Sequence, residues 1–483
     1  MPSPSPVRVL SRRTVKPPPR PRHRIPLTTW DVSFLSADYI QKGLLYARPP
    51  FPTARLLDHL EAALAQTLDA YYPVAGRFAT DQHRDSHNDA VVTGCSVSID
   101  CDGQGVDILH AVAERVSIAD VVPPDADVPR LVHSFFPLDG AINHDAHHLP
   151  LFVVQVTDLD DGVFIGFAYS HALSDGTAFW DFLNAWAATA RQKQSPSPSP
   201  QKKATPLLQR WSPDDGLPPQ PVVLPYPDLT PVVERLSPPP LRERMLHFSA
   251  DSLEALKARA REELLAAGDA AGAAALTKFQ ALSSLVWRCV TRARRLPPDQ
   301  LTACRAAINN RPRLRPQLPP EYFGNSIYAV SAEAVRAGEL LARGHGWAAA
   351  AVGRAVAAHT DADIRARVAA WMAKPVLYNL RFFDPSGVMM GSSPRFDMYG
   401  CDLGWGKPLA ARSGRANKSD GKASLYPARE GGGSIDVELA LTPEHMAMLE
   451  QDREFWAAVS PDKPPPCATA TATATVGELK ETN

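Results

Sequence analysis

His171 and Asp175 are residues whose types and spacing could do chemistry. They stand in the segment His171-Ala172-Leu173-Ser174-Asp175-Gly176. A histidine can accept a proton near neutral pH, which makes His171 a candidate general base. Asp175 follows four positions later, but the intervening turn means that the two side chains need not face each other. Within this candidate catalytic pair we expect Asp175 to be the structural acid, capping a helix and pairing with an arginine.

The residues around this segment predict a strand, a turn and a helix. Residues 163–169 form an apolar and aromatic run of strand length, and a helix with inward aromatic residues follows Asp175. An Asp-rich turn at 158–162 separates this strand from another at 151–156, which predicts an antiparallel hairpin with His171 at its far end. A core strand that gives way to a turn can present a reactive side chain rigidly. Two residue types at one spacing also recur by chance, so the motif is a hypothesis until its context fits.

Length and composition limit the possible function classes. The chain has 483 residues, of which 45% are hydrophobic and 21% charged, with a formal net charge of -1. This length suggests more than one domain, and the composition is that of an ordinary globular protein. The small net charge gives no electrostatic reason to expect nucleic acid or a membrane surface as a partner.

The cysteines and the first residues bear on the compartment. The chain has six cysteines, scattered without a C-x-x-C pair, which favours reduced thiols. The first 24 residues are rich in Arg and Pro and lack acids, a faint likeness to a transit peptide. Residues 7–11 alternate like a strand, however, and no apolar secretory core is present. We therefore expect a cytoplasmic protein.

Composition divides the chain into two halves. We expect an N-terminal domain at 1–191, a Pro-rich crossover at 192–240 and a C-terminal domain at 241–483. The crossover holds the alternating Ser-Pro run 195–200, for which we expect disorder. In the second half the pattern predicts helices and strands. The helices are expected at 251–266, 277–295, 348–373 and 443–459, and the strands at 244–248, 301–308, 376–383 and 435–441.

Two other signals have plainer interpretations. The run Asn143-His144-Asp145-Ala146-His147-His148 holds three histidines, but no distant Cys or His completes a zinc site, so a polar loop is favoured. Trp180 and Trp186 fall on one helix face and are expected in the core, not on a nucleic-acid stacking platform. We therefore expect no metal.

Further motifs accompany the histidine segment. Residues 399–408 read Tyr-Gly-Cys-Asp-Leu-Gly-Trp-Gly-Lys-Pro, and the segments 72–78, 322–325 and 433–438 add three more. Together they resemble the plant BAHD acyltransferases, whose two signatures are H-x-x-x-D-G and D-F-G-W-G. The order and approximate spacing match, over nearly the whole chain except the Ser-Pro run and the tail. The departure is Leu403 where the family usually has Phe, an apolar exchange that we expect to repack a loop.

The resemblance implies a fold and a reaction. The fold is α/β, with two similar-sized chloramphenicol-acetyltransferase-like domains of mixed sheets and an active-site channel at their interface. Acyl-CoA would enter one face as co-substrate, with no permanently bound cofactor, and a small-molecule acceptor would enter the other. The protein would be a monomer that transfers an acyl group to a hydroxyl or amine of a plant specialised metabolite.

The resemblance also implies roles for single residues. His171 would be the general base for direct transfer between the two bound substrates, and no G-x-S-x-G segment is present to form an acyl-enzyme. Asp175 would pair with an arginine, for which Arg311 is the first candidate and Arg313 the second. The residues expected to be structural are Gly176, Arg311, Asp402, Gly404, Trp405 and Gly406.

The binding residues are less sharply indicated. Thr277 can cap a helix with Lys278 beside it, and such an end suits a phosphate or a pantetheine carbonyl of CoA. An ordinary capped helix with a solvated lysine explains the same two residues. Ser36, Asp38 and Tyr46 are expected on the acceptor side.

A second function class fits the same fold. A relative could have lost acyl transfer and act as a lyase-like enzyme on a small acid, or as a non-catalytic binding protein. His171, Asp175 and Gly176 favour the transferase, since a binding protein need not keep a base at that strand end.

Overall fold

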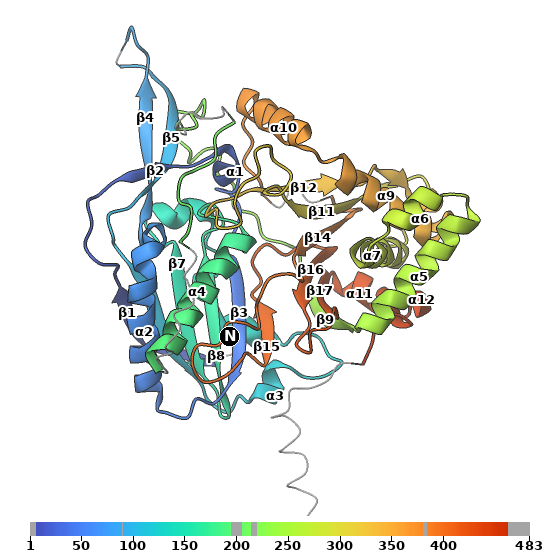
Figure 1. The fold of residues 1–483 in the computed structure, drawn as a ribbon, viewed down its shortest axis with the longest axis horizontal. Helices are drawn as coiled ribbons and strands as arrows, with labels where there is room; N and C mark the ends of the chain where they lie inside the picture. Colours follow the sequence, from blue (N-terminus) through green and yellow to red (C-terminus); the bar gives the residue numbers. More distant parts are fainter. Residues whose placement is uncertain (1–5, 89, 195–204, 214–219, 380–383, 462–483) are drawn as a thin grey trace, which may run out of the picture.

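Two six-stranded mixed sheets organise the molecule (Figure 1). The computed structural model describes residues 6–88, 90–194, 205–213, 220–379 and 384–461. The first sheet has the order β1-β6-β7-β8-β3-β15. Its strands are β1 (Val7–Val15), β3 (Ile40–Ala47), β6 (Val106–Ala113), β7 (Phe152–Asp158), β8 (Gly162–Tyr169) and β15 (Ala410–Ser413).

Helices α2 (Thr53–Ala70) and α4 (Gly176–Gln194) pack together against the first sheet. Leu56, Leu60 and Leu64 recur at helical spacing along α2 and are fully buried. The predicted hairpin is present, because β7 and β8 pair antiparallel from Phe152↔Tyr169 to Asp158↔Val163. Every residue of β8 is buried, so the strand that leads to His171 is anchored along its whole length.

The second sheet has the order β12-β11-β14-β16-β17-β9. Helices α5 (Ala250–Ala266), α7 (Lys278–Ala293) and α9 (Gly344–Ala358) pack on one another and form its outer layer (Figure 1). The sheet's other side is turned toward the first half of the molecule. Its strands are β9 (Arg242–Phe248), β11 (Cys304–Asn309), β12 (Ile327–Ser331), β14 (Val388–Ser392), β16 (Lys422–Pro427) and β17 (Ile435–Leu441).

Smaller elements complete the described chain. A three-stranded sheet has the order β2-β5-β4 and a two-stranded one pairs β10 with β13. These strands are β2 (Arg24–Pro26), β4 (Arg77–Arg84), β5 (Val92–Asp100), β10 (Leu301–Thr302) and β13 (Val335–Arg336). The short helices are α1 (Thr29–Val32), η1 (Tyr72–Ala75), α3 (Ile118–Val121), η2 (Arg130–Phe135), η3 (Asn143–His147), α6 (Ala270–Ala275), α8 (Ala337–Ala342), α10 (Asp361–Ala373), α11 (Pro443–Leu449) and α12 (Arg453–Trp456).

One strand crosses between the two halves. β15 comes from the second half of the sequence but pairs antiparallel with β3, in register from Ala410↔Leu45 to Ser413↔Lys42. All other strands of the first sheet precede residue 191. The fold is therefore a two-domain α/β architecture in which the second half completes the sheet of the first. The boundaries 1–191, 192–240 and 241–483 remain a prediction.

The described part of the crossover is packed against the core. Arg210 is 3% exposed and donates hydrogen bonds to the carbonyl oxygens of Phe323 and Leu173. Trp211 stacks on Trp30 with ring centroids 4.5 Å apart. The Ser-Pro run 195–200 lies outside the described residues.

Some predicted elements have different bounds. The helix expected at 348–373 is wrong as a single element, because α9 ends at Ala358 and α10 begins at Asp361. Thr360 accepts a hydrogen bond from the Asp363 amide in a capping box and starts the new helix. The helix at 443–459 is likewise two short ones, α11 and α12. Residues 376–379 form no strand, and 380–383 lie outside the described residues.

Candidate active site

The junction between β8 and α4 presents His171. β8 ends at Tyr169 and α4 begins at Gly176, so His171 lies in the connecting turn. Asp175 caps the helix, since its Oδ1 accepts hydrogen bonds from the amides of Thr177 at 3.1 Å and Ala178 at 3.2 Å. The strand, the turn and the cap expected from the sequence are all present.

Three distant segments hold His171 in place. Its amide donates to Oδ1 of Asn143 at 2.7 Å, and its carbonyl accepts from Nδ2 of Asn325 at 2.8 Å. The imidazole stacks on Phe34, with centroids 4.1 Å apart and planes 11° apart. Backbone and ring are thus fixed by residues from both halves of the chain.

Burial sets the protonation state of His171. It lowers the pKa of the imidazole, because a charged ring is poorly solvated there, while the contact with its own backbone, the charge of Asp175 and the side chain of Asn325 oppose the shift. Among the described residues, buried Nδ1 has no hydrogen-bond partner of good geometry. The residue keeps some accessible surface, and a neutral imidazole can accept a proton.

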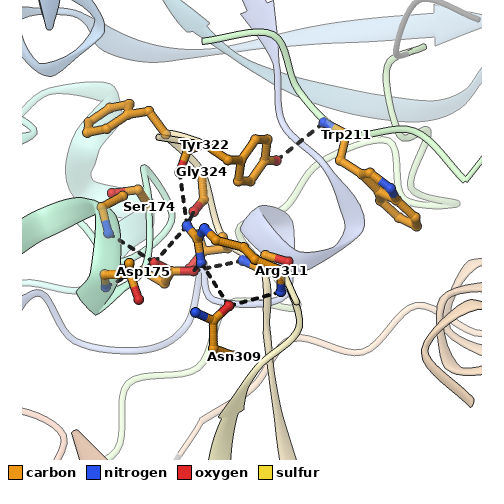
Figure 2. A network of polar contacts seen from close by, with 12 residues as sticks. Ser174, Asp175, Trp211, Asn309, Arg311, Tyr322 and Gly324 are labelled. Carbon is orange, nitrogen blue, oxygen red and sulfur yellow. Dashed lines mark hydrogen bonds and ion pairs between the residues drawn. The ribbon is translucent and has the colours of Figure 1, made fainter. Parts of the chain in front are cut away.

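Asp175 forms a buried ion pair with Arg311 (Figure 2). Its Oδ2 lies 2.7 Å from one guanidinium nitrogen and its Oδ1 lies 3.1 Å from the other. Arg311 also donates to the carbonyl oxygens of Tyr322 and Gly324, both at 3.0 Å. The predicted pairing of Asp175 with Arg311 is confirmed. Arg313 instead donates to the carbonyl oxygens of Val356 and His359.

The ion pair joins the two halves of the molecule. Asp175 leads into α4, whereas Arg311 follows β11 of the second sheet. The amide of Ser326 also donates to Oδ2 of Asp175 at 2.9 Å. Both carboxylate oxygens are therefore engaged by Arg311 and by backbone amides, which leaves Asp175 with a positioning role.

The loop at 401–406 docks on the first half. Oδ1 of Asp402 accepts hydrogen bonds from the amides of Gly404 at 2.8 Å and Gly406 at 3.0 Å. Both glycines have positive φ, 116° and 128°, which explains the residue type. Nε1 of Trp405 donates to the carbonyl of Ala47 at 3.2 Å. Leu403 is 2% exposed and sits in the core of the first half, so the apolar exchange keeps its position buried.

Gly176 permits a close contact between the two halves. A Cβ at this position would lie 2.9 Å from the ring of Phe396. A larger residue would push residue 396 and the chain that follows β14 away from the start of α4.

The residues expected at CoA form the predicted helix start. Thr277 and Gln280 form a capping box at the N-terminus of α7. Nζ of Lys278 donates to the carbonyl of Ala250 at 3.4 Å and lies 3.3 Å from Glu254. These contacts connect α7 to α5, as an ordinary capped helix would, and CoA binding at Thr277 and Lys278 remains a prediction.

The residues expected near the acceptor lie in different surroundings. Oδ2 of Asp38 accepts from the amide of Asn417 at 2.9 Å, and burial raises the pKa of its carboxyl group. Oγ of Ser36 accepts from the amide of Glu234 at 3.3 Å. The Tyr46 hydroxyl donates to the carbonyl of Cys401 at 2.7 Å, and this engages it in holding the 401–406 loop.

Sequence reasoning missed the two asparagines that grip His171. Asn143 is fully buried and also donates to the carbonyl oxygens of Phe34 and Ala37. It precedes the three histidines of residues 144–148, and an asparagine before such a run carries no sequence signal of its own. Asn325 also donates to Oδ1 of Asp31 at 2.8 Å and ends the segment 322–325, which resembles the family. Across the described ranges, no group of three or more His, Cys, Asp or Glu residues could hold a metal ion.

Comparisons with known proteins identify the family of this chain. The Transferase family pattern matches residues 5–456. An uncharacterized acetyltransferase of Arabidopsis thaliana is 34% identical over 90% of this chain and 94% of its own length. The BAHD acyltransferase DCR, also from Arabidopsis thaliana, is 33% identical over 93% of this chain and 92% of its own.

Solved structures share the fold. Vinorine synthase superimposes with a TM-score of 0.70 at 20% identity, covering 94% of this chain and 99% of its own. TRI101 of F. graminearum, complexed with ethyl coenzyme A, gives a TM-score of 0.68 at 17% identity, covering 91% and 99%. With the histidine segment, the docked loop and the two mixed sheets in place, the chain belongs to the Transferase family of BAHD acyltransferases.

Proposed function

We propose that this chain transfers an acyl group from a CoA thioester to a hydroxyl or amine of a small plant metabolite, with His171 as the general base. The observation that carries the proposal is a single one: a histidine fixed by Asn143, Asn325 and Phe34, with its pKa lowered by burial. A neutral imidazole is the state that can accept a proton. Relatives and neighbours named as acyltransferases or complexed with coenzyme A support the same assignment.

The reaction needs one proton transfer in each direction. Nε2 of His171 takes the proton of the acceptor hydroxyl or amine, whose oxygen or nitrogen then attacks the thioester carbonyl. The tetrahedral intermediate collapses, the carbon–sulfur bond breaks, and the imidazolium returns the proton to the CoA thiolate. A well-placed base contributes about 10²–10⁴-fold, and binding both substrates together contributes much of the remainder.

The other residues then have supporting roles. Asp175 and Arg311 hold the turn that carries His171. The 401–406 loop joins the two halves of the molecule, which would enclose the channel. Thr277 and Lys278 are the proposed contacts for CoA, and Ser36, Asp38 and Tyr46 lie on the proposed acceptor side. The protein acts as a monomer in the cytoplasm under this proposal. No helix in the described ranges has the length and apolar character needed to cross a membrane.

Thiol release tests the proposal. Acetyl-, malonyl-, benzoyl- and hydroxycinnamoyl-CoA are each offered with pooled phenolic and amine acceptors, and the free thiol is measured. We expect acceptor-dependent release that is lost in His171→Ala. A second readout is the melting temperature, which coenzyme A must raise if it binds only the folded state. If no thiol is released and coenzyme A does not raise the melting temperature, a same-fold protein that has lost acyl transfer is favoured.

A further inference from the structure

Two lysines lie in the region where the two sheets face each other. Lys42 is on β3 of the first sheet and Lys422 is on β16 of the second. Burial lowers the pKa of Lys42 to about 7 and that of Lys422 to about 8. Both side chains nevertheless keep some accessible surface, as His171 does.

Lys42 has an unusual set of partners for a buried cation. Its Nζ donates to the hydroxyl of Tyr426 at 2.6 Å and lies 4.4 Å from the centre of that ring. The Tyr426 hydroxyl in turn donates to Oε2 of Glu438 at 2.9 Å. Among the described residues no carboxylate forms an ion pair with Lys42 itself. A phenol oxygen satisfies one of the three N–H donors of an ammonium group but supplies no negative charge.

The nearby carboxylates form ion pairs with another lysine, Lys418. Lys418 pairs with Glu243 at 2.5 Å and with Glu438 at 3.0 Å. Glu438 also accepts a hydrogen bond from Ser413, and Glu243 lies 3.2 Å from His133. Both of these carboxylates thus pair with Lys418, and neither forms an ion pair with Lys42 in the described part of the chain.

Lys422 lies on the same strand as Tyr426, the partner of Lys42. Lys422, Ser424 and Tyr426 alternate along β16 and therefore share the face that meets Lys42. A Cβ on Gly391 would lie 2.5 Å from Nζ of Lys422, so the ammonium group passes over β14 where that glycine leaves room. The charge of Lys422 also contributes to lowering the pKa values of both Lys42 and His171. Lys42 also lies opposite Phe167 on β8, the strand that leads to His171.

We propose that Lys42 and Lys422 bind a carboxylate group of a substrate next to His171, so that this enzyme acts on an acyl donor or an acceptor that carries a free carboxylate. The assignment rests on the proposed function for the identity of the reaction. A carboxylate accepts charge-assisted hydrogen bonds from both ammonium groups and supplies the negative charge that Lys42 lacks. Hydrogen bonds to charged groups of this kind change affinity by about tenfold to a hundredfold.

Paired ligands distinguish the donor from the acceptor. Titration calorimetry compares malonyl-CoA with acetyl-CoA, and a panel of phenolic acids with their methyl esters. We expect the unmodified protein to prefer the carboxylate-bearing member of one pair by about tenfold or more. A preference within the first pair assigns the carboxylate to the donor, and one within the second assigns it to the acceptor.

Variants connect the preference to the two lysines. Lys42→Met and Lys422→Met should each remove most of it while leaving the uncharged partner's affinity unchanged. Lys16→Met, at an exposed position beyond β1, is the matched control and should keep the preference. Thiol release with the same donors is measured separately. Binding preference without thiol release would contradict the proposed function but keep the carboxylate site.

Two results would overturn the site. The first is an unmodified protein that binds both members of each pair equally, which needs no variant to be folded. The second is a preference that survives in both lysine variants.

Discussion

His171 combines a fixed orientation with a neutral ring. Its amide donates a hydrogen bond to Asn143, its carbonyl accepts one from Asn325, and the ring of Phe34 fixes its imidazole plane. The same packing that orients the ring removes water from it, and removing water disfavours the charged form. The fixed orientation and the neutral state of the ring therefore have a common cause at this residue.

Removing the imidazole should abolish most catalysis without unfolding the protein. We expect His171→Ala to lower kcat/KM by about 10²–10⁴-fold, since a positioned general base contributes that much. His148→Ala, at an exposed position of the nearby histidine run, is the control and should retain activity. The measurement is thiol release together with a thermal melt of each variant. A His171→Ala enzyme with more than a tenth of the activity would exclude the role of base.

The lowered pKa of His171 predicts a pH profile. The base must be neutral, and its folded pKa lies below the ordinary value of 6.5. The rate should thus stay constant as pH falls from 8 through 6.5, and decline only below that, when the ring becomes protonated. A kcat/KM profile for an uncharged acceptor checks this. An acidic limb centred at or above pH 6.5 would contradict the burial of the imidazole.

Helix α4 begins at an ion pair that ties it to the second sheet. Asp175 caps the first turn and at the same time contacts Arg311 beyond the end of β11. Both side chains are buried, so the opposite charge of each one replaces the water that would otherwise stabilise the other. The segment that carries the base thereby acquires its position from both halves.

Breaking this pair should cost stability along with activity. We expect Asp175→Ala to destabilise the fold by about 3–5 kcal/mol, because it leaves a buried guanidinium uncompensated. Asp299→Ala, on the surface, is the matched control. Denaturant unfolding followed by circular dichroism measures the difference. Equal midpoints for Asp175→Ala and the parent protein would show that the carboxylate does not hold the fold together.

The sequence predicted correctly those elements that are determined by neighbouring residues. The hairpin before His171, the Asp175 cap and helix α7 follow from runs of buried residues and capping groups. The sequence also contains a signal for the break between α9 and α10, because Thr360 and Asp363 have capping-box spacing. The alanine-rich run 348–373 has continuous helical periodicity across this position, and that periodicity led to the prediction of a single helix.

Contacts between distant segments could not be predicted in this way. β15 has only four residues and no alternating pattern, and its partner β3 lies more than 300 positions away. Arg210 lies in a Pro-rich stretch, yet it is buried against Leu173 and Phe323. The Asp175–Arg311 pair was predicted only because a family resemblance supplied what spacing alone does not.

At the scale of the whole molecule, a buried ionic group connects the two sheets. Lys418 binds Glu243 and Glu438, and Glu438 accepts from Ser413 of β15 and Tyr426 of β16. Burial raises the pKa of Glu438, but the charges of Lys418 and Lys42 and its hydrogen bonds outweigh it, so the folded pKa lies below the ordinary 4.5. The carboxylate is the form that the folded state needs.

Neutralising Glu438 should weaken this connection. We expect Glu438→Gln to lower the free energy of unfolding by about 3–5 kcal/mol, because a buried lysine loses part of its counter-charge. Since the folded pKa is depressed, the contribution of Glu438 is present above pH 4.5 and is lost as pH falls through the folded pKa. The difference in melting temperature between variant and parent should therefore stay constant from pH 7 to about 5 and shrink progressively between pH 4.5 and pH 2. Glu262→Gln, on the exposed side of α5, should track the parent throughout, and a Glu438→Gln variant that does the same would refute the prediction.

The pairing of β15 with β3 has a consequence for how the chain folds during synthesis. β3 lies next to β8, the strand that leads to His171, and its outer edge is covered by residues 410–413. Until those residues leave the ribosome, β3 is an exposed edge strand that carries the buried residues Leu44, Leu45 and Tyr46. The first sheet therefore cannot close during most of translation, and a nascent chain arrested between residues 191 and 410 presents an edge open to chaperones and to other chains.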